Sequence, residues 1–322
     1  MDNLTHSLIG AALGQAGLKR KTGLAMSALI IGANIPDIDA GCVVYGIESL
    51  AMRRGITHGP IAMVLLPLML AGGLWWFDKW QAKRGKRPEG RAPVHFGWLY
   101  ALSLIACLTH PLFDWFNNYG VRLLEPFSHR WFYGDTLFII DPWIWAMLGS
   151  GIWFSLRRER AVIAKWNRPV HAAWMAVSIY ISLNFIVSRI ANDTIPLAYD
   201  GPSLQVANAV PLAFWRREVP WRDDGWLDAP RWRDTYGSEE FSLFGGKTFD
   251  SKGKLTNMED PRIAEWSKND PAAQAFLFWS RMPIAELHDD HIILRDQRFM
   301  DSRTARQFSI TLRRPDTASY PE

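Results

Sequence analysis

His110 and Asp114 lie four residues apart at the end of an otherwise apolar run, residues 96–113. On a helix this spacing places the imidazole and the carboxylate on one face. The apolar interior of a membrane tolerates ionisable side chains only where they pair with each other, face a cavity or take part in chemistry. The pair therefore predicts a functional site at the end of this helix.

Histidines and aspartates also lie at the ends of other apolar segments. Thr5-His6 begins the first segment, residues 34–39 (Asn-Ile-Pro-Asp-Ile-Asp) end the second, and Thr57-His58 begins the third. Imidazole nitrogen with carboxylate oxygen is the ligand set of Zn²⁺, Mn²⁺ or Fe²⁺. The sequence therefore predicts a site for one or two divalent metal ions, Zn²⁺ or Mn²⁺ first, with these candidate ligands: His6, Asp37, Asp39, His58, His110 and Asp114.

A divalent metal ion in such a site favours hydrolysis. The ion lowers the pKa of a bound water towards neutrality and polarises a carbonyl or phosphoryl oxygen. Asp141, which begins the fifth apolar segment, is predicted to act as a general base or to orient a ligand histidine. The expected reaction is metal-dependent cleavage of an ester or a phosphoester.

Each of these residues also has a purely structural interpretation. His6 and His58 can simply begin helices, and the two aspartates after Pro36 can be loop carboxylates where a helix stops. His110 and Asp114 can form a satisfied buried pair. Side chains that serve packing alone would be scattered over both membrane faces, however, and these all lie at one expected face. Their shared placement favours a functional site.

The segments that must position these residues appear as runs without charge. Residues 59–77 contain no charged residue over 19 positions and residues 169–188 none over 20, which meets the roughly 18 to 20 residues that span a bilayer. The other segments are shorter or carry a charge. About six membrane segments are predicted, at residues 4–18, 22–36, 59–77, 96–113, 136–156 and 169–188. The expected fold of residues 1–191 is an all-α membrane bundle.

Residues 192–322 are polar and predict a small soluble α+β domain. Residues 241–244, 292–294 and 308–312 are typical of strands bounded by turn residues, and residues 271–279 are typical of a short helix. Cys42 and Cys107 fit neither a disulfide framework nor a paired zinc motif. The chain is therefore expected to consist of a membrane domain followed by a soluble one.

Lysine and arginine predict the orientation in the membrane. The loops after the first, third and fifth segments hold three, six and five basic residues, whereas the alternate loops hold only Arg53, Arg54, Arg122 and Arg130. Cytoplasmic loops are enriched in basic residues, so the candidate ligands and the C-terminal domain are expected on the outer side of a bacterial inner membrane. The basic loop 79–91 fits an anionic leaflet surface and lacks the regular aromatic interleaving that would indicate nucleic acid.

Four motifs together resemble a known family. They are Asn3-Leu4-Thr5-His6 leading into a Gly/Ala helix, residues 33–39, Arg54-Gly55-Ile56-Thr57-His58, and His110-x-x-x-Asp114. In combination they are similar to the signature of the LexA-regulated, inner-membrane-associated metal-dependent hydrolases, over about residues 1–191. Residues 119–128 and 138–143 resemble the longer members, which also append a polar C-terminal domain.

The resemblance implies a metal-dependent hydrolase, with a metal site formed by His6, Asp37, Asp39, His58, His110 and Asp114. Many members read His-Arg-Gly-x-Thr-His-Ser, and here Arg53 stands at the position of the first histidine and Gly59 at that of the serine. This departure takes one ligand from the set expected for two metals. A weaker similarity to the all-helical zinc phospholipase C and single-strand nuclease fold points towards phosphoester cleavage.

The sequence thus predicts a multi-pass membrane hydrolase that acts at the outer membrane interface. The lipid bilayer is the expected partner and an amphiphilic ester or phosphoester the expected substrate, because a site at headgroup depth meets lipids first. The competing class is a non-enzymatic membrane protein, either a metal or proton carrier or an assembly factor whose outer domain binds a partner. A carrier should continue its polar groups through the bilayer, and the third and sixth segments show almost none.

Overall fold

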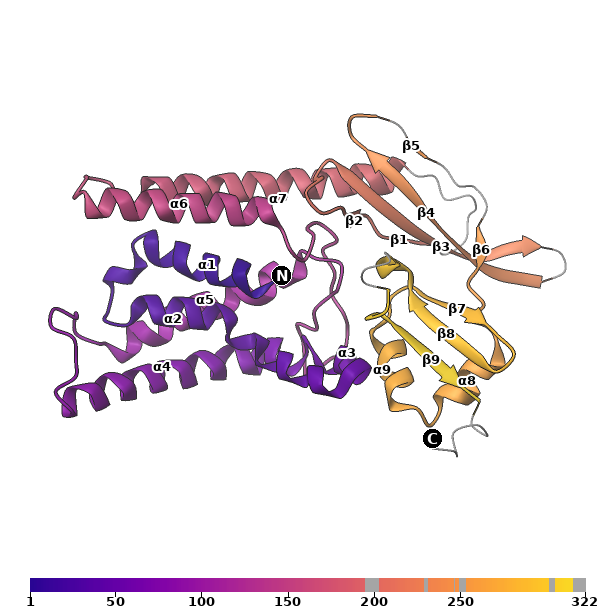
Figure 1. The fold of residues 1–322 in the computed structure, drawn as a ribbon, viewed down its shortest axis with the longest axis horizontal. Coiled ribbons are helices and arrows are strands. Elements are labelled where there is room, and N and C mark those ends of the chain that lie inside the picture. Colours follow the sequence, from indigo (N-terminus) through magenta and orange to yellow (C-terminus); the bar gives the residue numbers. More distant parts are fainter. Residues whose placement is uncertain (195–202, 229–230, 246, 249–252, 301–304, 315–322) are drawn as a thin grey trace. The chain divides into compact units, whose positions relative to one another are not determined.

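The computed structural model describes residues 1–194, 203–228, 231–245, 247–248, 253–300 and 305–314. The chain forms two compact units. Figure 1 shows the elements of both. The helical unit comprises Met1–Asp39, Arg54–Ile186 and Pro211–Phe214, and the sheet unit comprises Ala40–Arg53, Val187–Val210 and Trp215–Glu322. Part of the loop after the second apolar segment therefore belongs to the sheet unit. The domain boundary expected between residues 191 and 192 stays a prediction.

Each of the predicted apolar segments contains or overlaps one helix of the helical unit. The helices are α1 (Asn3–Gln15), α2 (Ala25–Asn34), α4 (Pro60–Lys83), α5 (Phe96–Trp115), α6 (Pro142–Arg160) and most of α7 (Arg168–Thr194), joined in part by the 3₁₀ turns η1 (Leu18–Arg20), η2 (Ile35–Glu48) and η3 (Ile56–His58). Local sequence features mark where several of these helices begin. The Asp2 carboxylate accepts from the first free amides of α1, and proline occupies the first turn of α4 and α6.

Two apolar cores hold the helical unit together. The first joins α1, α5, α6 and α7, and its buried side chains include Ile9, Phe113, Ile144, Leu148 and Val177. The second joins α2, α4 and α5, and its buried side chains include Leu29, Ala71, Leu99 and Leu102. In an apolar bilayer, close packing of such side chains rather than their removal from water holds helices together. Because α5 takes part in both cores, the helix that carries His110 and Asp114 is fixed at the centre of the unit.

The helices α1 and α2 approach each other closely at Gly10. A Cβ atom at this position would lie 2.5 Å from the carbonyl oxygen of Leu29 and 2.8 Å from the Cα atom of Ile30, distances that real side chains do not occupy. Small residues serve this purpose between membrane helices, because they let two backbones touch. The contact fixes α1, which carries His6, against the helix that leads to Asp37.

Four helical stretches among the described residues are long and apolar enough to cross a membrane. They are Ala25–Met52, which joins α2, η2 and α3, and the helices Pro60–Lys83, Phe96–Trp115 and Arg168–Asp193. The expected count of about six segments is therefore corrected to four. The helix α1 has 13 residues, which gives a length of ~20 Å against the ~30 Å apolar core of a bilayer. The helix α6 has 19 residues, but its last turn carries Arg157, Arg158 and Arg160.

The sheet unit contains two antiparallel sheets. At the centre of the larger sheet, β3 (Arg216–Asp228) pairs with β4 (Arg231–Ser242). The short strands β1 (Ser203–Gln205) and β2 (Asn208–Ala209) pair with β3, and β5 (Lys247–Thr248) and β6 (Lys254–Leu255) pair with β4. The smaller sheet has the order β7 (Pro283–Leu287), β8 (His291–Asp296), β9 (Ser309–Arg313). The helices α8 (Pro261–Ser267) and α9 (Pro271–Trp279) contact β9, and α3 (Ser49–Met52) contacts α9.

The sequence prediction of a C-terminal domain that mixes helices and strands is confirmed. The helix α9 covers the predicted residues 271–279, and β8 and β9 cover most of the predicted strands at residues 292–294 and 308–312. The longest strand, β3, was not predicted. It carries Arg216, Arg217, Glu218 and Arg222, so no run of apolar residues marks it as a strand.

Asp296 anchors the smaller sheet from a fully buried position. Its carboxylate accepts hydrogen bonds from Ser280 Oγ (2.6 Å) and from the backbone N–H of Arg281 (3.0 Å), and it pairs with Arg298 Nε (2.9 Å). Burial by itself would raise the pKa of Asp296, but the Arg298 charge and the hydrogen bonds outweigh it and hold the pKa below its usual range.

We expect this carboxylate to make the sheet unit sensitive to acid. Because the pKa is lower in the folded than in the unfolded state, the stabilisation is fully present above the unfolded value of about 4 and is lost as the pH falls through the folded value. The protection factors of the β8 amides against hydrogen exchange in the full chain should fall below about pH 4. In Asp296→Asn the protection factors should be lower at pH 7 and depend less on pH. An unchanged pH dependence in the variant would contradict this account.

Candidate metal centre

Segments far apart in the sequence bring histidine and aspartate together in the helical unit. His6 lies in the first turns of α1, Asp37 follows α2 in η2, and His58 ends η3 just before α4. His110 and Asp114 lie in the last turns of α5. The side chains of His6, His58, His110 and Asp114 are almost completely buried. The structure therefore places most of the predicted ligands in one interior location.

Four of these side chains lie close enough to share one ion. Asp37, His58, His110 and Asp114 each offer a ligand atom, and these atoms all lie within 4.8 Å of one another. His58 Nε2 lies 3.4 Å and His110 Nε2 3.5 Å from Asp114 Oδ2, and His110 Nε2 lies 3.5 Å from Asp37 Oδ1. Ligand atoms bound about 2.0 Å from a tetrahedral Zn²⁺ lie about 3.3 Å apart. These three separations are close to this value, and all pairs in the group lie within 4.8 Å.

The atoms at the centre of this group lack hydrogen bonds. Among the described residues, Nε2 of His58, Nε2 of His110 and Oδ2 of Asp114 are buried without a hydrogen-bond partner, although Oδ2 of Asp114 lies 3.1 Å from Arg54 Nε in an ion pair. Buried polar atoms are nearly always satisfied, because leaving one unpaired costs about 1–3 kcal/mol. One divalent ion would satisfy all three atoms. The donor set, the separations and the unsatisfied atoms therefore fit a metal site.

The Nδ1 atoms of His58 and His110 have hydrogen-bond partners outside the group of four. His110 Nδ1 lies 2.7 Å from the carbonyl oxygen of Ala33, and His58 Nδ1 lies 2.9 Å from Thr57 Oγ1 and 3.5 Å from Asp39 Oδ2. A proton on Nδ1 leaves the lone pair on Nε2, the form of histidine that binds a metal. Burial lowers the pKa of His58 and so favours its neutral form.

Asp39 lies outside the group of four and supports it. Its Oδ2 accepts hydrogen bonds from the backbone N–H of Arg54 (2.7 Å) and from Thr57 Oγ1 (2.8 Å), which holds the turn that carries His58. The structure thus gives Asp39 the contacts of a residue that positions a ligand. Its predicted role as a ligand stays a prediction.

We expect Asp39→Asn to weaken metal binding without abolishing it. Partners of this kind typically contribute about 10–100-fold to metal affinity. The amide keeps one acceptor oxygen for Arg54 and Thr57 but loses the negative charge that strengthens both hydrogen bonds. Competition with a chromogenic chelator measures the affinity, and His58→Ala serves as the ligand-loss reference. Wild-type affinity in Asp39→Asn would contradict the positioning role, and a loss equal to that of His58→Ala would make Asp39 a ligand.

His6 contacts the group through Asp114 and His110. The His6 and His110 rings stack with their centroids 3.8 Å apart, and His6 Nε2 lies 3.4 Å from Asp114 Oδ1. The amine of Met1 donates a hydrogen bond to the same oxygen. Within the described residues, neither ring nitrogen of His6 has a hydrogen-bond partner. Asp114 therefore presents one oxygen to the group of four and the other to His6.

Arg54 belongs to the site, although the sequence analysis did not place it there. Its Nε lies 3.1 Å from Asp114 Oδ2, its Nη1 donates to Asn117 Oδ1 at 2.9 Å, and its guanidinium lies over the Tyr119 ring at 4.7 Å. The side chain is buried, and the backbone φ of 53° is unusual for a residue other than glycine. The available signal was that Arg54 opens the motif Arg54-Gly55-Ile56-Thr57-His58, in a loop of the less basic membrane side.

Asp141 lies outside the group of four and begins α6. Its Oδ1 accepts from the backbone N–H groups of Trp143 (3.0 Å) and Ile144 (3.2 Å), and its Oδ2 accepts from the Tyr180 hydroxyl (2.9 Å). These are the contacts of a helix cap. Burial raises the pKa of Asp141. Its role in catalysis stays a prediction, because the observed contacts account for the carboxylate without it.

Apolar helices that end in buried histidine and aspartate define a helical membrane protein with a candidate metal site. The chain belongs to the YdjM inner membrane protein family, which matches residues 1–191. It is similar to YfhP of Bacillus subtilis (strain 168), described as an uncharacterized protein, with 28% identity over 259 residues that cover 69% of this chain and 74% of that protein. No solved structure matches the chain. The family match covers all the residues of the candidate metal centre.

Proposed function

We propose that this protein is a membrane-bound, metal-dependent hydrolase whose ion is held by Asp37, His58, His110 and Asp114. The observation that carries the proposal is the convergence of four ligand atoms from three chain segments, three of them buried without a hydrogen bond. When bound, Zn²⁺ or Mn²⁺ would supply an activated water and a Lewis acid for an ester or phosphoester. Control by LexA, which the family resemblance implies, stays a prediction.

Arg54 supports a phosphoester rather than a neutral ester as substrate. Its guanidinium lies beside Asp114 and is fixed by Asn117 and Tyr119. Arginine binds phosphate oxygens and keeps its charge at any physiological pH. A cation already positioned at the ligand carboxylate would bind and orient an anionic group next to the ion.

Exposed apolar side chains support an amphiphilic substrate. Ile38 is 58% exposed and lies between Asp37 and Asp39, and Ile56 is 70% exposed and lies two residues before His58. Phe127 is 75% exposed and follows Glu125, whose carbonyl oxygen closely approaches Gly59. Exposed apolar side chains that gather near a site are compatible with contact with a membrane. The site would therefore meet its substrate at the membrane surface.

Membrane association is supported by the family and by the four apolar helices. We further propose that the metal centre and the C-terminal domain lie outside the cytoplasm, because the basic loops predict the opposite face as cytoplasmic. Alkaline phosphatase fused after residue 314 should then be active, and a fusion within residues 85–91 should be inactive. The reverse result would contradict this orientation.

The function is tested with the full chain in nanodiscs. Protein stripped with a chelator and reloaded with Zn²⁺ or Mn²⁺ is offered a panel of phosphodiesters, phospholipids and carboxyl esters, and product formation is followed by mass spectrometry. We expect turnover of at least one amphiphilic phosphoester that requires the reloaded ion. Metal binding without turnover of any panel member, combined with metal uptake into proteoliposomes, would favour the carrier alternative and contradict the proposal.

A further inference from the structure

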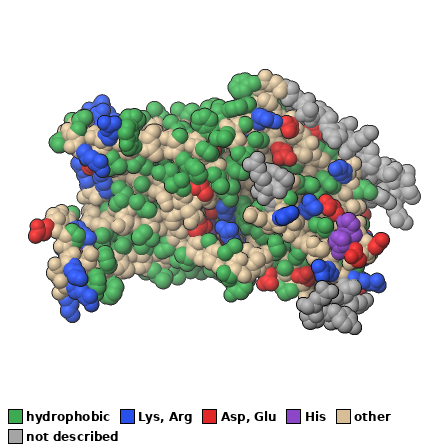
Figure 2. All heavy atoms as spheres, in the orientation of Figure 1, with side chains coloured by type: hydrophobic (Ala, Val, Ile, Leu, Met, Phe, Trp, Pro, Cys, Tyr) green, Lys and Arg blue, Asp and Glu red, His purple; other side chains and the backbone are tan. Residues whose placement is uncertain are grey.

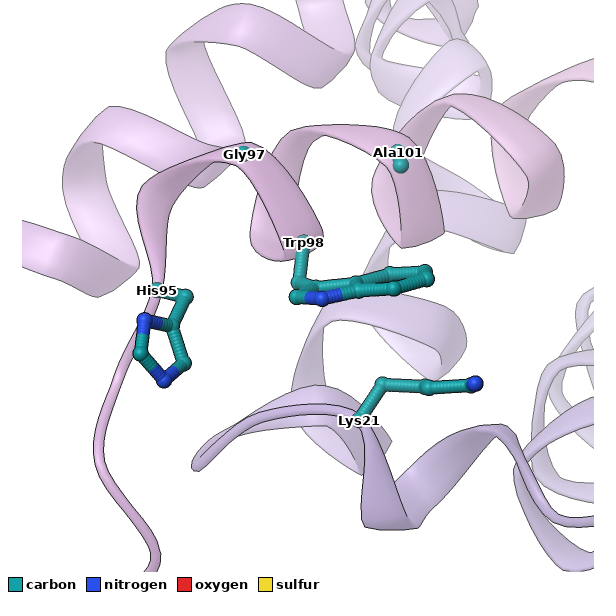
Figure 3. A pocket seen from close by; sticks show the side chains of 5 residues that line it. All are labelled: Lys21, His95, Gly97, Trp98 and Ala101. Carbon is teal, nitrogen blue, oxygen red and sulfur yellow. The ribbon is translucent and has the colours of Figure 1, made fainter.

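A second polar site lies in the helical unit at the other end of α5. A pocket of about 480 Å³ is lined by Lys21, His95, Gly97, Trp98 and Ala101, and Figure 3 shows the Lys21 side chain lying along the Trp98 ring. The pocket is lined by residues 95–101 at the start of α5, and the metal centre uses His110 and Asp114 near its end, so the two sites lie about 20 Å apart along the helix axis. The two sites therefore lie towards opposite ends of a helix that is long enough to cross a membrane.

Hydrogen bonds between two chain segments fix the walls of this pocket. The backbone N–H of His95 donates to Thr22 Oγ1 at 2.8 Å, and the backbone N–H of Gly23 donates to the carbonyl oxygen of Pro93 at 3.0 Å. Thr22 is buried, although its neighbour Lys21 is exposed. These hydrogen bonds hold the segment after η1 against the start of α5. They therefore fix the position of the Lys21 backbone beside the pocket.

The pocket offers a positive charge at Lys21. Lys21 Nζ lies 5.0 Å from the centroid of the Trp98 ring, and among the described residues Lys21 forms no ion pair. Lys19, by contrast, pairs with Glu159. The N-cap residue His95 makes no side-chain hydrogen bond to the first amides of α5, so its side chain leaves these N–H groups uncapped.

The surroundings of the pocket are those of a membrane surface. Figure 2 shows lysine and arginine side chains gathered at this end of the helical unit. Trp98 is 42% exposed and Phe96 is 41% exposed, and large aromatic side chains are typical of the level where headgroups meet acyl chains. The pocket volume lies within the range of small-ligand sites, about 300–1,000 Å³.

We propose that this pocket binds the phosphate headgroup of an anionic phospholipid in the leaflet opposite the metal centre. Lys21 would pair with the phosphate, the Gly97 and Trp98 amides would donate to its oxygens, and Phe96 and Trp98 would contact the start of the acyl chains. The pocket is a binding site separate from the proposed hydrolase centre, and it does not depend on that function. A soluble phosphate lacks the acyl chains and would lose the aromatic contacts.

Native mass spectrometry of the full chain, released from detergent with added phosphatidylglycerol or phosphatidylcholine, tests the proposal. We expect one tightly retained phosphatidylglycerol and a retention weaker by about 5-fold in Lys21→Gln, the effect of one lysine at a membrane surface. Lys79→Gln is the matched control, because Lys79 also lies over a tryptophan, Trp75 at 5.4 Å, but does not line the pocket. Its retention should equal that of the wild type.

Two further measurements keep the proposal open to refutation. Lys21→Arg should restore retention, because it returns the charge, and inorganic phosphate at millimolar concentration should leave the bound lipid in place. Equal losses in Lys21→Gln and Lys79→Gln would show general surface charge and overturn the pocket. Equal retention of phosphatidylcholine, or displacement of the lipid by inorganic phosphate, would overturn the anionic phospholipid as its ligand.

Discussion

The double variant His110→Ala, Asp114→Ala should lose its bound Zn²⁺ or Mn²⁺ and any hydrolytic activity. The two residues supply two of the four converging ligand atoms, and Asp114 is the one that both His58 and His110 face. Loss of a residue outside the ligands already costs about 10–100-fold in metal affinity, so removal of two ligands should reduce the affinity by more than about 100-fold. Elemental analysis of the purified protein gives the metal content per chain.

His171→Ala is the matched control for this experiment. His171 lies in α7, is exposed and is not part of the group of four, so its loss should leave the metal content and the activity unchanged. A double variant that keeps the wild-type metal content would rule out the proposed centre. Equal metal loss in the control would show that the bound ion is adventitious.

Arg54→Met should destabilise the metal-free protein strongly and the metal-loaded protein much less. Without an ion, the variant leaves the buried Asp114 carboxylate without its guanidinium partner, and breaking a buried ion pair costs about 3–5 kcal/mol. A bound divalent ion would compensate most of that charge. The melting temperature of Arg54→Met should therefore drop far more in chelator than in Zn²⁺.

Arg54→Lys separates charge from shape in the same measurement. Lysine keeps the positive charge but cannot reach Asp114 and Asn117 together as the planar guanidinium does, so its stability should be intermediate without metal. Equal deficits for Arg54→Met with and without Zn²⁺ would indicate that Asp114 and Arg54 form a structural ion pair with no metal beside it. That result would contradict the metal centre while leaving the fold intact.

The convergence of the ligands could be predicted from sequence because it follows from helix ends. His58, His110 and Asp37 each lie where an apolar run begins or stops, and apolar runs of membrane length can be read without a structure. Alternation of chain direction then brings those ends to one face. The carboxyl-terminal helix α9 was predictable for a similar local reason, since Asp270 and Pro271 mark its start.

Roles within the site could not be predicted in this way. Asp37 and Asp39 are two residues apart and chemically identical, and only the fold shows that Asp37 faces His110 whereas Asp39 accepts from Thr57 and Arg54. Arg54 reads as a surface loop residue until the chain brings Asp114 to it. The number of membrane segments was overestimated because the shorter segment at residues 4–18 and the charged segment at residues 136–156 were counted with the others, whereas four helical stretches among the described residues are long and apolar enough to cross a membrane.

Anomalous X-ray scattering from crystals of the zinc-loaded protein, recorded above and below the zinc absorption edge, tests the central claim most directly. We predict a peak among Asp37 Oδ1, His58 Nε2, His110 Nε2 and Asp114 Oδ2, within about 2.0–2.2 Å of each ligand atom. The absence of any peak there, with Arg54 still paired to Asp114, or a zinc ion bound elsewhere on the chain, would contradict the account.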